Sequence, residues 1–212
     1  MHKQIFEESF MNLLNKNFLS LSKYFEFKLE VFCEFDTLIF EINKCLILEL
    51  DRASITLTNH LLERLLKLAL IHSESGIDAI PVEKWNASFY EPNKKYGKIT
   101  LGNSIEKCKK IDLITEQEKN MLFGFVREFM RNGFSHADSS KILASLPDES
   151  KMFQGSLTNS KELKEVSINQ KIIPTFQALQ MENFAKKHSK LYFDFVFNLI
   201  FRIEKRLIEK VK

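Results

Sequence analysis

Glycine and proline are scarce in this chain, whose 212 residues include 6 glycines and 4 prolines. All-β folds need many turns, which depend on these two residue types, whereas helices tolerate few of either. The shortage therefore argues against a turn-rich sandwich or barrel and favours helices. A chain of this length forms one domain, or one domain with an extension, and can bury a core without disulfide or metal staples.

Cysteine is also rare, and the three copies are Cys33, Cys45 and Cys108. An odd number without framework spacing argues against a disulfide scaffold and indicates a reducing compartment. No CxxC motif or Cys/His cluster suggests zinc, so we expect no metal and no cofactor. The N-terminal segment carries Glu7 and Glu8 and lacks an apolar signal core. These features together predict a cytoplasmic protein.

Long hydrophobic runs are missing as well. The most apolar stretch, residues 191–201, is interrupted by Asp194, whereas a membrane-spanning helix needs about 20 apolar residues. The net charge of +3 is mild and does not identify a nucleic-acid binder. Residues 1–51 are acidic, and the basic residues gather around 94–110 and 186–212. These basic segments are either solvated helix faces or a face that attracts phosphate.

Apolar residues, 20 of them phenylalanines, recur at spacings of three and four and predict helices. The expected helices cover residues 3–32, 34–50, 52–72, 102–112, 116–129, 141–146 and 175–211. Thr115 followed three residues later by Glu118 matches a capping box, which marks the start of a helix. Segments 73–96 and 148–173 are interpreted as loops, the second with a short helix near residues 161–165.

The one pointed chemical feature is RNGFSH, residues 131–136. Gly133 is expected to interrupt the helix, so the chain bends between Arg131 and His136 and their side chains can converge. Histidine can move a proton to or from a hydroxyl, and arginine can hold phosphate oxygens. Asn132 can orient the imidazole or bind a phosphate oxygen. This set suits phosphodiester chemistry on RNA, whose 2′-hydroxyl is a built-in nucleophile.

The same residues have a purely structural interpretation, because motifs this short arise by chance. Arg131 would bond carbonyls at a helix end, Asn132 would cap the helix, and His136 would be a hydrogen-bonded turn residue. Asp138 or Ser139 would cap the next helix. The six residues alone leave both interpretations open.

In its context, MLFGFVREFMRNGFSHAD resembles the HEPN superfamily (higher eukaryotes and prokaryotes nucleotide-binding domains). That family is recognised by an arginine, usually followed by a polar residue such as asparagine, and a histidine four to six residues further on. ASITLTNHLLERLLKLAL resembles the first core helix, LGNSIEKCKKIDLITEQEKNML the segment before the motif, and residues 184–208 the closing helix. The resemblance covers residues 52–210.

The resemblance implies an all-α fold, in which residues 52–212 form a HEPN-like helical bundle and residues 1–51 an N-terminal helical extension. It implies a homodimer with two motifs facing each other across a cleft. Many members are metal-independent endoribonucleases of toxin–antitoxin, abortive-infection or other anti-phage defence systems. Carried over to this chain, Arg131 and His136 would be catalytic and Asn132 supporting, with RNA as the substrate.

Three further residues are supporting candidates. Glu63, on the polar face of its helix, is expected to hold Arg131 or Arg127, with plain surface charge as the alternative. Asp138 either orients His136 or caps a helix. The remaining histidines His60, His72 and His188 match no motif position and are interpreted as structural or surface residues.

Two other functions are weighed against the ribonuclease. A non-catalytic HEPN-fold module would use the same residues to dimerise or to bind a partner or nucleotide, since fold does not determine function. The basic and aromatic residues 184–212 also fit a membrane-surface helix, but core burial explains their apolar positions better, so no membrane partner is expected. Any antitoxin or sensor would be a separate protein.

Overall fold

The computed structural model describes residues 2–135, 139–144, 146–156 and 159–211. Within these ranges the protein is mostly helical, with one two-stranded antiparallel hairpin. The α-helices are α1 (His2–Leu21), α2 (Asp36–Ile47), α3 (Asp51–Ser75), α4 (Trp85–Tyr96), α5 (Leu101–Lys110), α6 (Glu116–Met121), α7 (Ser139–Leu143) and α8 (Pro174–Val211). A π-helix (Leu122–Ser135) follows α6, and the strands are β1 (Glu149–Ser156) and β2 (Asn159–Asn169).

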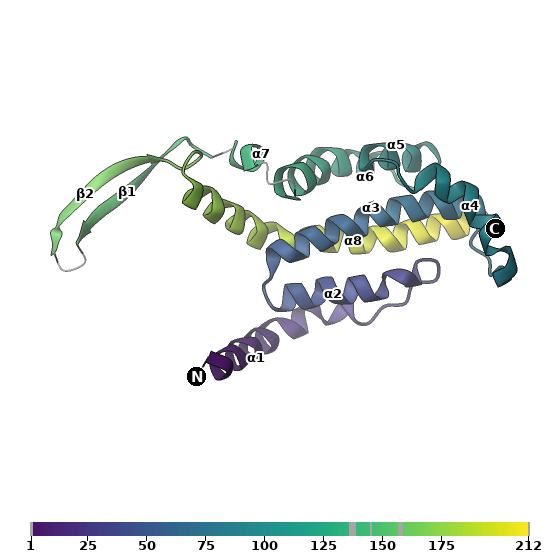
Figure 1. The fold of residues 1–212 in the computed structure, drawn as a ribbon, viewed down its shortest axis with the longest axis horizontal. Coiled ribbons are helices and arrows are strands. Elements are labelled where there is room, and N and C mark those ends of the chain that lie inside the picture. Colours follow the sequence, from purple (N-terminus) through teal and green to yellow (C-terminus); the bar gives the residue numbers. More distant parts are fainter. Residues whose placement is uncertain (1, 136–138, 145, 157–158, 212) are drawn as a thin grey trace.

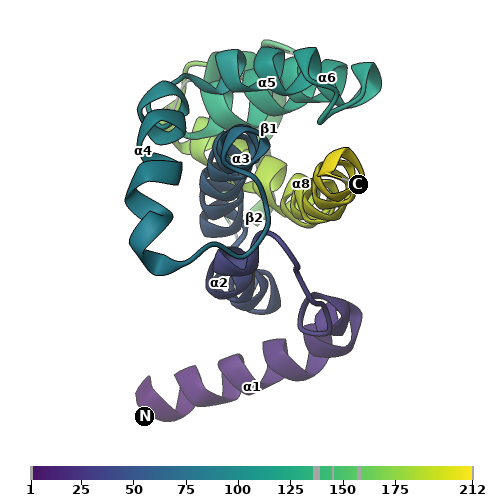
Figure 2. The ribbon, with the colours of Figure 1, turned by 90° about the vertical axis from the view of Figure 1, so that its right-hand side faces the viewer.

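The helices lie in three layers. One outer layer contains α5, α6 and the π-helix, the middle layer contains α3 and α8, and the other outer layer contains α2 and α1 (Figures 1 and 2). α3 has neighbours on both sides, and its buried apolar residues form a broad stripe beside a polar face. Its core residues include Ile55, Leu61, Leu62, Leu65, Leu66, Ala69 and Leu70.

The capping box expected at residue 115 is present at the start of α6. Thr115 Oγ1 accepts the N–H of Glu118 at 3.1 Å, and the Thr115 N–H donates to Glu118 Oε2 at 2.7 Å. Each side chain satisfies one backbone donor that the helix itself leaves unpaired. The helix α6, which leads into the motif residues, therefore begins at the position that the sequence predicts.

The expected helix over residues 3–32 is wrong beyond Leu21, where α1 ends. At residues 30, 31 and 32 the Oε1 of Glu204 on α8 accepts the N–H groups at 2.7–3.1 Å, so these donors need no helical partner. Backbone donors in a buried segment must be paired, and here a distant side chain replaces the helical partners. Two short 3-10 turns, Ser22–Tyr24 and Cys33–Phe35, flank this segment.

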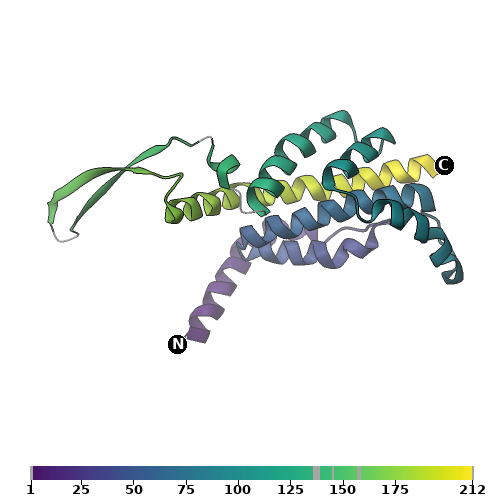
Figure 3. The same cartoon turned by 45° about the horizontal axis from the view of Figure 1, so that its top comes forward.

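The long loop expected over residues 148–173 is also wrong, because most of it forms the β1–β2 hairpin. Met152 pairs with Val166 and Ser150 with Ile168 across the strands, and Lys151 forms an ion pair with Glu165 at 2.6 Å. Such cross-strand pairs stabilise a hairpin. It projects with the first turns of α8 from one end of the molecule (Figure 3). The all-α expectation is corrected to a mostly helical fold with a hairpin.

The segment 73–96, also expected to be a loop, contains α4 at the opposite end of the molecule (Figure 1). Trp85 is its first residue and donates from Nε1 to the Ile80 carbonyl at 3.0 Å. Pro92 lies inside this helix. A proline inside a helix lacks the N–H that would bond the carbonyl four residues back, and its ring crowds that carbonyl, which explains why the sequence favours a loop.

Residues before position 51 share the core of the rest of the chain. Phe32, Phe35, Ile39 and Ile42 are fully buried in the same cluster as the apolar residues of α3 and α8. Tyr24 is 1% exposed, and its hydroxyl donates to Asp194 on α8 at 2.8 Å. The division of the chain at residue 51 stays a prediction.

Candidate active site

The motif residues Arg131 and Asn132 lie near the end of the π-helix. The expected interruption at Gly133 is wrong, because the π-helix continues through it to residue 135. Gly133 is buried, and a side-chain carbon there would lie 3.2 Å from Ile142 on α7. The glycine therefore allows close packing of α7 rather than a bend. Most π-helical segments are a single turn, so the length of this one is unusual. Such segments are frequent at functional sites.

Arg131 forms an ion pair with Glu63 on α3, between its Nε and the carboxylate Oε1. The two side chains are 31% and 28% exposed, so the pair is accessible to solvent without being fully solvated. Glu63 is the partner expected from the polar face of its helix. An ion pair to Nε constrains the plane of the guanidinium, which is delocalised and carries its donors in a fixed fork.

A second contact binds the same part of the π-helix to α3. The Asn59 Nδ2 donates to the Met130 carbonyl at 2.8 Å, and the buried Tyr192 hydroxyl on α8 donates to Asn59 Oδ1 at 2.7 Å. Burial first, and the negative charge of Glu63 second, raise the pKa of Tyr192 well above its usual range. The hydroxyl therefore stays protonated and keeps its donor. Residues 59 and 63, one turn apart, thus hold residues 130 and 131.

A polar cavity of about 310 Å³ opens beside Glu63 between α3 and α4. Its polar lining includes His60, Arg64, Lys67 and Asn93. His60 and Arg64 are exposed and Lys67 is half-buried. Two cations and an imidazole around one carboxylate leave the cavity positive, which favours a phosphate group.

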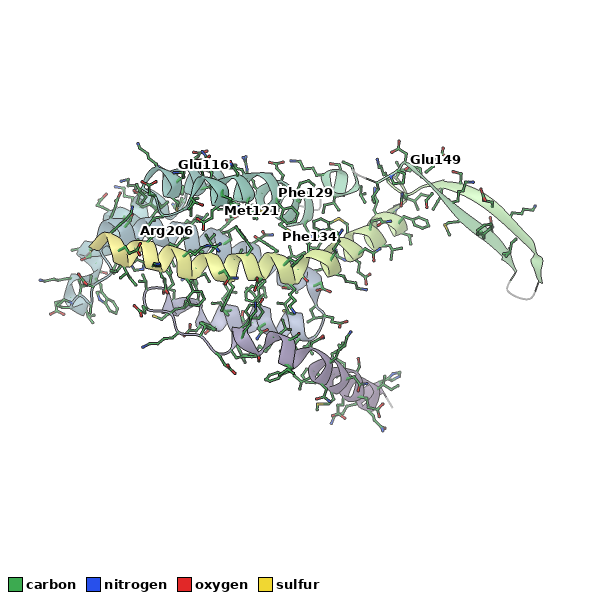
Figure 4. The ribbon with its side chains drawn as sticks, turned by 180° about the vertical axis from the view of Figure 1, so that it is seen from behind. Glu116, Met121, Phe129, Phe134, Glu149 and Arg206 are labelled. Carbon is green, nitrogen blue, oxygen red and sulfur yellow. The ribbon has the colours of Figure 1, made fainter. Side chains whose placement is uncertain are left out.

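A second cavity of about 440 Å³ lies between the π-helix, α7 and α8. Phe125, Phe129 and Phe184 line it with His188, whose ring centroid is 5.5 Å from that of Phe125 and 4.5 Å from that of Phe184. Burial first, and the charge of Lys187 second, lower the pKa of His188, so its imidazole is neutral at pH 7. Figure 4 shows Phe129 on the π-helix above the middle of α8.

The other predicted site residues are placed as follows. Arg127 does not contact Glu63 in the manner of Arg131; its guanidinium lies over the Phe123 ring, 5.5 Å from the centroid. Asn132 is half-buried in the last turn of the π-helix, and its supporting role stays a prediction. His136 and Asp138 lie outside the described residues.

The sequence interpretation missed the positive residues of the polar cavity. The sequence alone predicts His60 to be a structural or surface residue and indicates no role for Arg64 and Lys67. A signal was available, because positions 60, 63, 64 and 67 follow helical spacing and share one face of α3. Nothing in the sequence indicated the Tyr192–Asn59 contact, whose residues are 133 positions apart.

Among the described residues, no group of three or more His, Cys, Asp or Glu side chains is placed to hold a metal ion. None of the helices in the described ranges is long and apolar enough to cross a membrane. No family model matches this chain, and neither does any curated protein or solved structure. The resemblance to the HEPN superfamily therefore stands on the residues of the motif and their helical context.

Proposed function

We propose that this chain is a metal-independent endoribonuclease of the HEPN type, with a HEPN-like arrangement of its helices. It cleaves RNA as a toxin or an anti-phage defence effector. Arg131 and His136 are its catalytic residues, and Asn132 and Glu63 support them. The observation that carries the proposal is the fixed position of Arg131, whose guanidinium is held by Glu63 at an accessible surface.

Two contacts give the motif arginine the rigidity that catalysis needs. Glu63 holds the guanidinium, and Asn59, backed by Tyr192, holds the adjoining carbonyl of Met130. A charge that is fixed before the reaction stabilises the transition state without reorganising during it. A loosely placed arginine would lose much of this effect.

The two cavities suit a single-stranded RNA. Arg64 and Lys67 supply positive charge for the phosphate backbone in the polar cavity. Phe125 and Phe129, with centroids 5.8 Å apart, offer ring faces to bases in the second cavity. Stacking on aromatic side chains and contacts to phosphate are the usual means of binding single strands.

In the proposed reaction, His136 accepts the proton of a ribose 2′-hydroxyl. The 2′-oxygen attacks the adjacent phosphorus, and Arg131 stabilises the negative charge that builds on the phosphoryl oxygens. The bond to the 5′-oxygen breaks, and that oxygen takes up the proton that His136 accepted. The products are a 2′,3′-cyclic phosphate and a 5′-hydroxyl end. The nucleophile belongs to the substrate, so this sequence of steps uses only side chains and RNA.

Two partners accompany this proposal. A second copy of the chain brings its own motif to the same cleft, as the resemblance implies, and a separate antitoxin or sensor protein restrains the activity. A second candidate function is a non-catalytic module that dimerises or binds a partner or nucleotide. The same Arg131–Glu63 ion pair favours it, because an arginine that ties two helices together also has a structural role.

The test is cleavage of a broad RNA panel in the presence of EDTA. We expect wild type to cleave and His136→Ala to lose activity by about 10²–10⁴-fold, the usual contribution of a general acid or base. His2→Ala is the matched control, since it removes an exposed imidazole from α1, away from both cavities, and should leave the rate unchanged.

Equal rates for wild type and His136→Ala would show that the cleavage does not come from this site. No cleavage by either protein would also exclude the ribonuclease. If both proteins then bound RNA with equal affinity, the binding module would be the better account.

A further inference from the structure

Helix α1 carries one apolar stripe that the fold covers only in part. Phe6, Phe10, Leu13 and Leu21 recur at helical spacing, and their exposure falls from 70% at Phe6 through 39% at Phe10 to 3% at Leu21. Asn17 holds the covered end on α2 by donating to a backbone carbonyl at 2.9 Å. Every residue from 2 to 12 is exposed. These first turns extend away from the bundle (Figures 2 and 3).

An apolar groove of about 400 Å³ lies beside this stripe, between α1 and α2. Phe10 and Leu14 line it from α1, and Phe18, Phe25 and Phe40 form an aromatic wall. The ring centroids of Phe18 and Phe25 are 5.6 Å apart, as are those of Phe25 and Phe40. Phe18 and Phe40 are nevertheless 48% and 47% exposed. Contiguous apolar surface of this kind marks an interaction site.

The charges of α1 argue against a membrane or nucleic acid as the occupant. Lys3 and Lys16 are balanced by Glu7 and Glu8, so the helix has no net charge apart from His2. Helices that lie on membranes are rich in lysine and arginine on their polar face, and nucleic acid requires an excess of positive charge. The occupant that fits best is a protein surface that also has an uncharged apolar helix beside an apolar groove. A second copy of this chain has both features.

The area that such a contact would bury is sufficient for a dimer. Phe6, Phe10, Phe18 and Phe40 together expose about 400 Å², taking about 200 Å² for a whole phenylalanine side chain. A two-fold contact uses the same surface on both copies, which gives about 800 Å² from these rings alone. Met11, 49% exposed and on the same face of α1 as Phe18, brings the total to about 1,000 Å², the least that a specific interface needs.

We propose that two copies of this chain associate through α1, with the projecting turns of each helix covering the α1–α2 groove of the other. This surface lies on the opposite side of the α3–α8 layer from the π-helix (Figures 1 and 2). It is therefore separate from a contact between two motifs, and it does not rest on the ribonuclease activity. A chain that used both surfaces would form assemblies larger than a dimer.

Sedimentation velocity of the full chain tests this proposal. We expect wild type to associate at micromolar concentration, and the double variant Phe6→Glu, Phe10→Glu to weaken that association at least about a hundredfold, because two carboxylates would be buried without partners. Both positions are exposed, so the variant should keep the wild-type circular dichroism spectrum and melting temperature. Asn12→Glu is the matched control, since it adds a charge to another face of α1 and should leave association unchanged.

A wild-type chain that stays monomeric would overturn the proposal, and so would assemblies of the same size in wild type and the double variant. Flotation with vesicles of phosphatidylcholine and phosphatidylglycerol is the second measurement. Vesicle binding by wild type that the double variant loses would assign α1 to membranes instead. RNA cleavage is measured in parallel, and the double variant should retain it. Loss of association and loss of cleavage are thus separate results.

Discussion

Replacing Glu118 by glutamine removes a negative charge from a place where three segments meet. The side chain is 10% exposed, and its Oε2 accepts the Thr115 N–H and Arg206 Nη1, both at 2.7 Å. Arg202 Nε lies 2.7 Å from Oε1 as an ion-pair contact rather than an aligned hydrogen bond. Removing one partner of a buried charge cluster costs several kcal/mol. Glutamine keeps part of the cap, and both arginines reach solvent. We therefore expect Glu118→Gln to lower the free energy of unfolding by about 3 kcal/mol.

That loss corresponds to a fall in melting temperature of roughly 6–12 °C for a domain of this size. Thermal unfolding followed by far-UV circular dichroism measures it for wild type, Glu118→Gln and Glu116→Gln. Glu116 is the matched control, because it is exposed on the first turn of the same helix (Figure 4) and loses at most about 1 kcal/mol of interaction with the helix dipole. The reasoning would be refuted if Glu118→Gln lowered the melting temperature no more than Glu116→Gln does.

The same substitution has a defined pH dependence. Burial alone would raise the pKa of Glu118, but the hydrogen bonds from Arg206 and Thr115 and the charge of Arg202 outweigh it, and the pKa is lowered. A carboxyl whose folded-state pKa is lowered stabilises the fold fully above its unfolded pKa of about 4.3, and less as the pH falls through the folded value. The difference in melting temperature between wild type and Glu118→Gln should therefore narrow below about pH 4.

Two further predictions concern packing and thiol chemistry. Gly133→Ala should destabilise the fold by roughly 1 kcal/mol, because the new carbon would meet Ile142 at 3.2 Å and a backbone carbonyl at 3.3 Å. Gly124→Ala in the same π-helix meets open space and should be neutral or stabilising in urea unfolding, so equal effects would contradict the packing argument. Burial raises the pKa of the Cys108 thiol to about 12. Ellman's reagent should therefore modify exposed Cys33 rapidly and Cys108 only on unfolding, and equal rates would show that α5 opens in the native state.

The sequence was sufficient to predict those helices and helix starts that neighbouring residues stabilise. Residues 52–72 predict a helix because their apolar positions repeat every three or four residues, and α3 covers them. Thr115 and Glu118 predict a helix start because the two side chains satisfy each other's backbone donors, and α6 begins there. The polar face of α3 was visible in the same way, and it placed Glu63 as a candidate partner of Arg131.

The tertiary structure decided what depends on residues far apart in the chain. The irregular chain at residues 30–32 depends on the Glu204 carboxylate, about 170 positions away. The flexibility of Gly133 predicts a helix break, yet the π-helix runs through it, and the lack of a side chain leaves room for Ile142.

The same division applies to the candidate site. The sequence by itself determined which chemical groups the chain carries near residue 131 and that they belong to a helical protein. Only the fold decided that Glu63 meets Arg131, that Asn59 and Tyr192 brace the helix beside it, and that a positive cavity opens next to them. Helical spacing is a property of a few consecutive residues, whereas these contacts join segments that approach each other only when the core is buried.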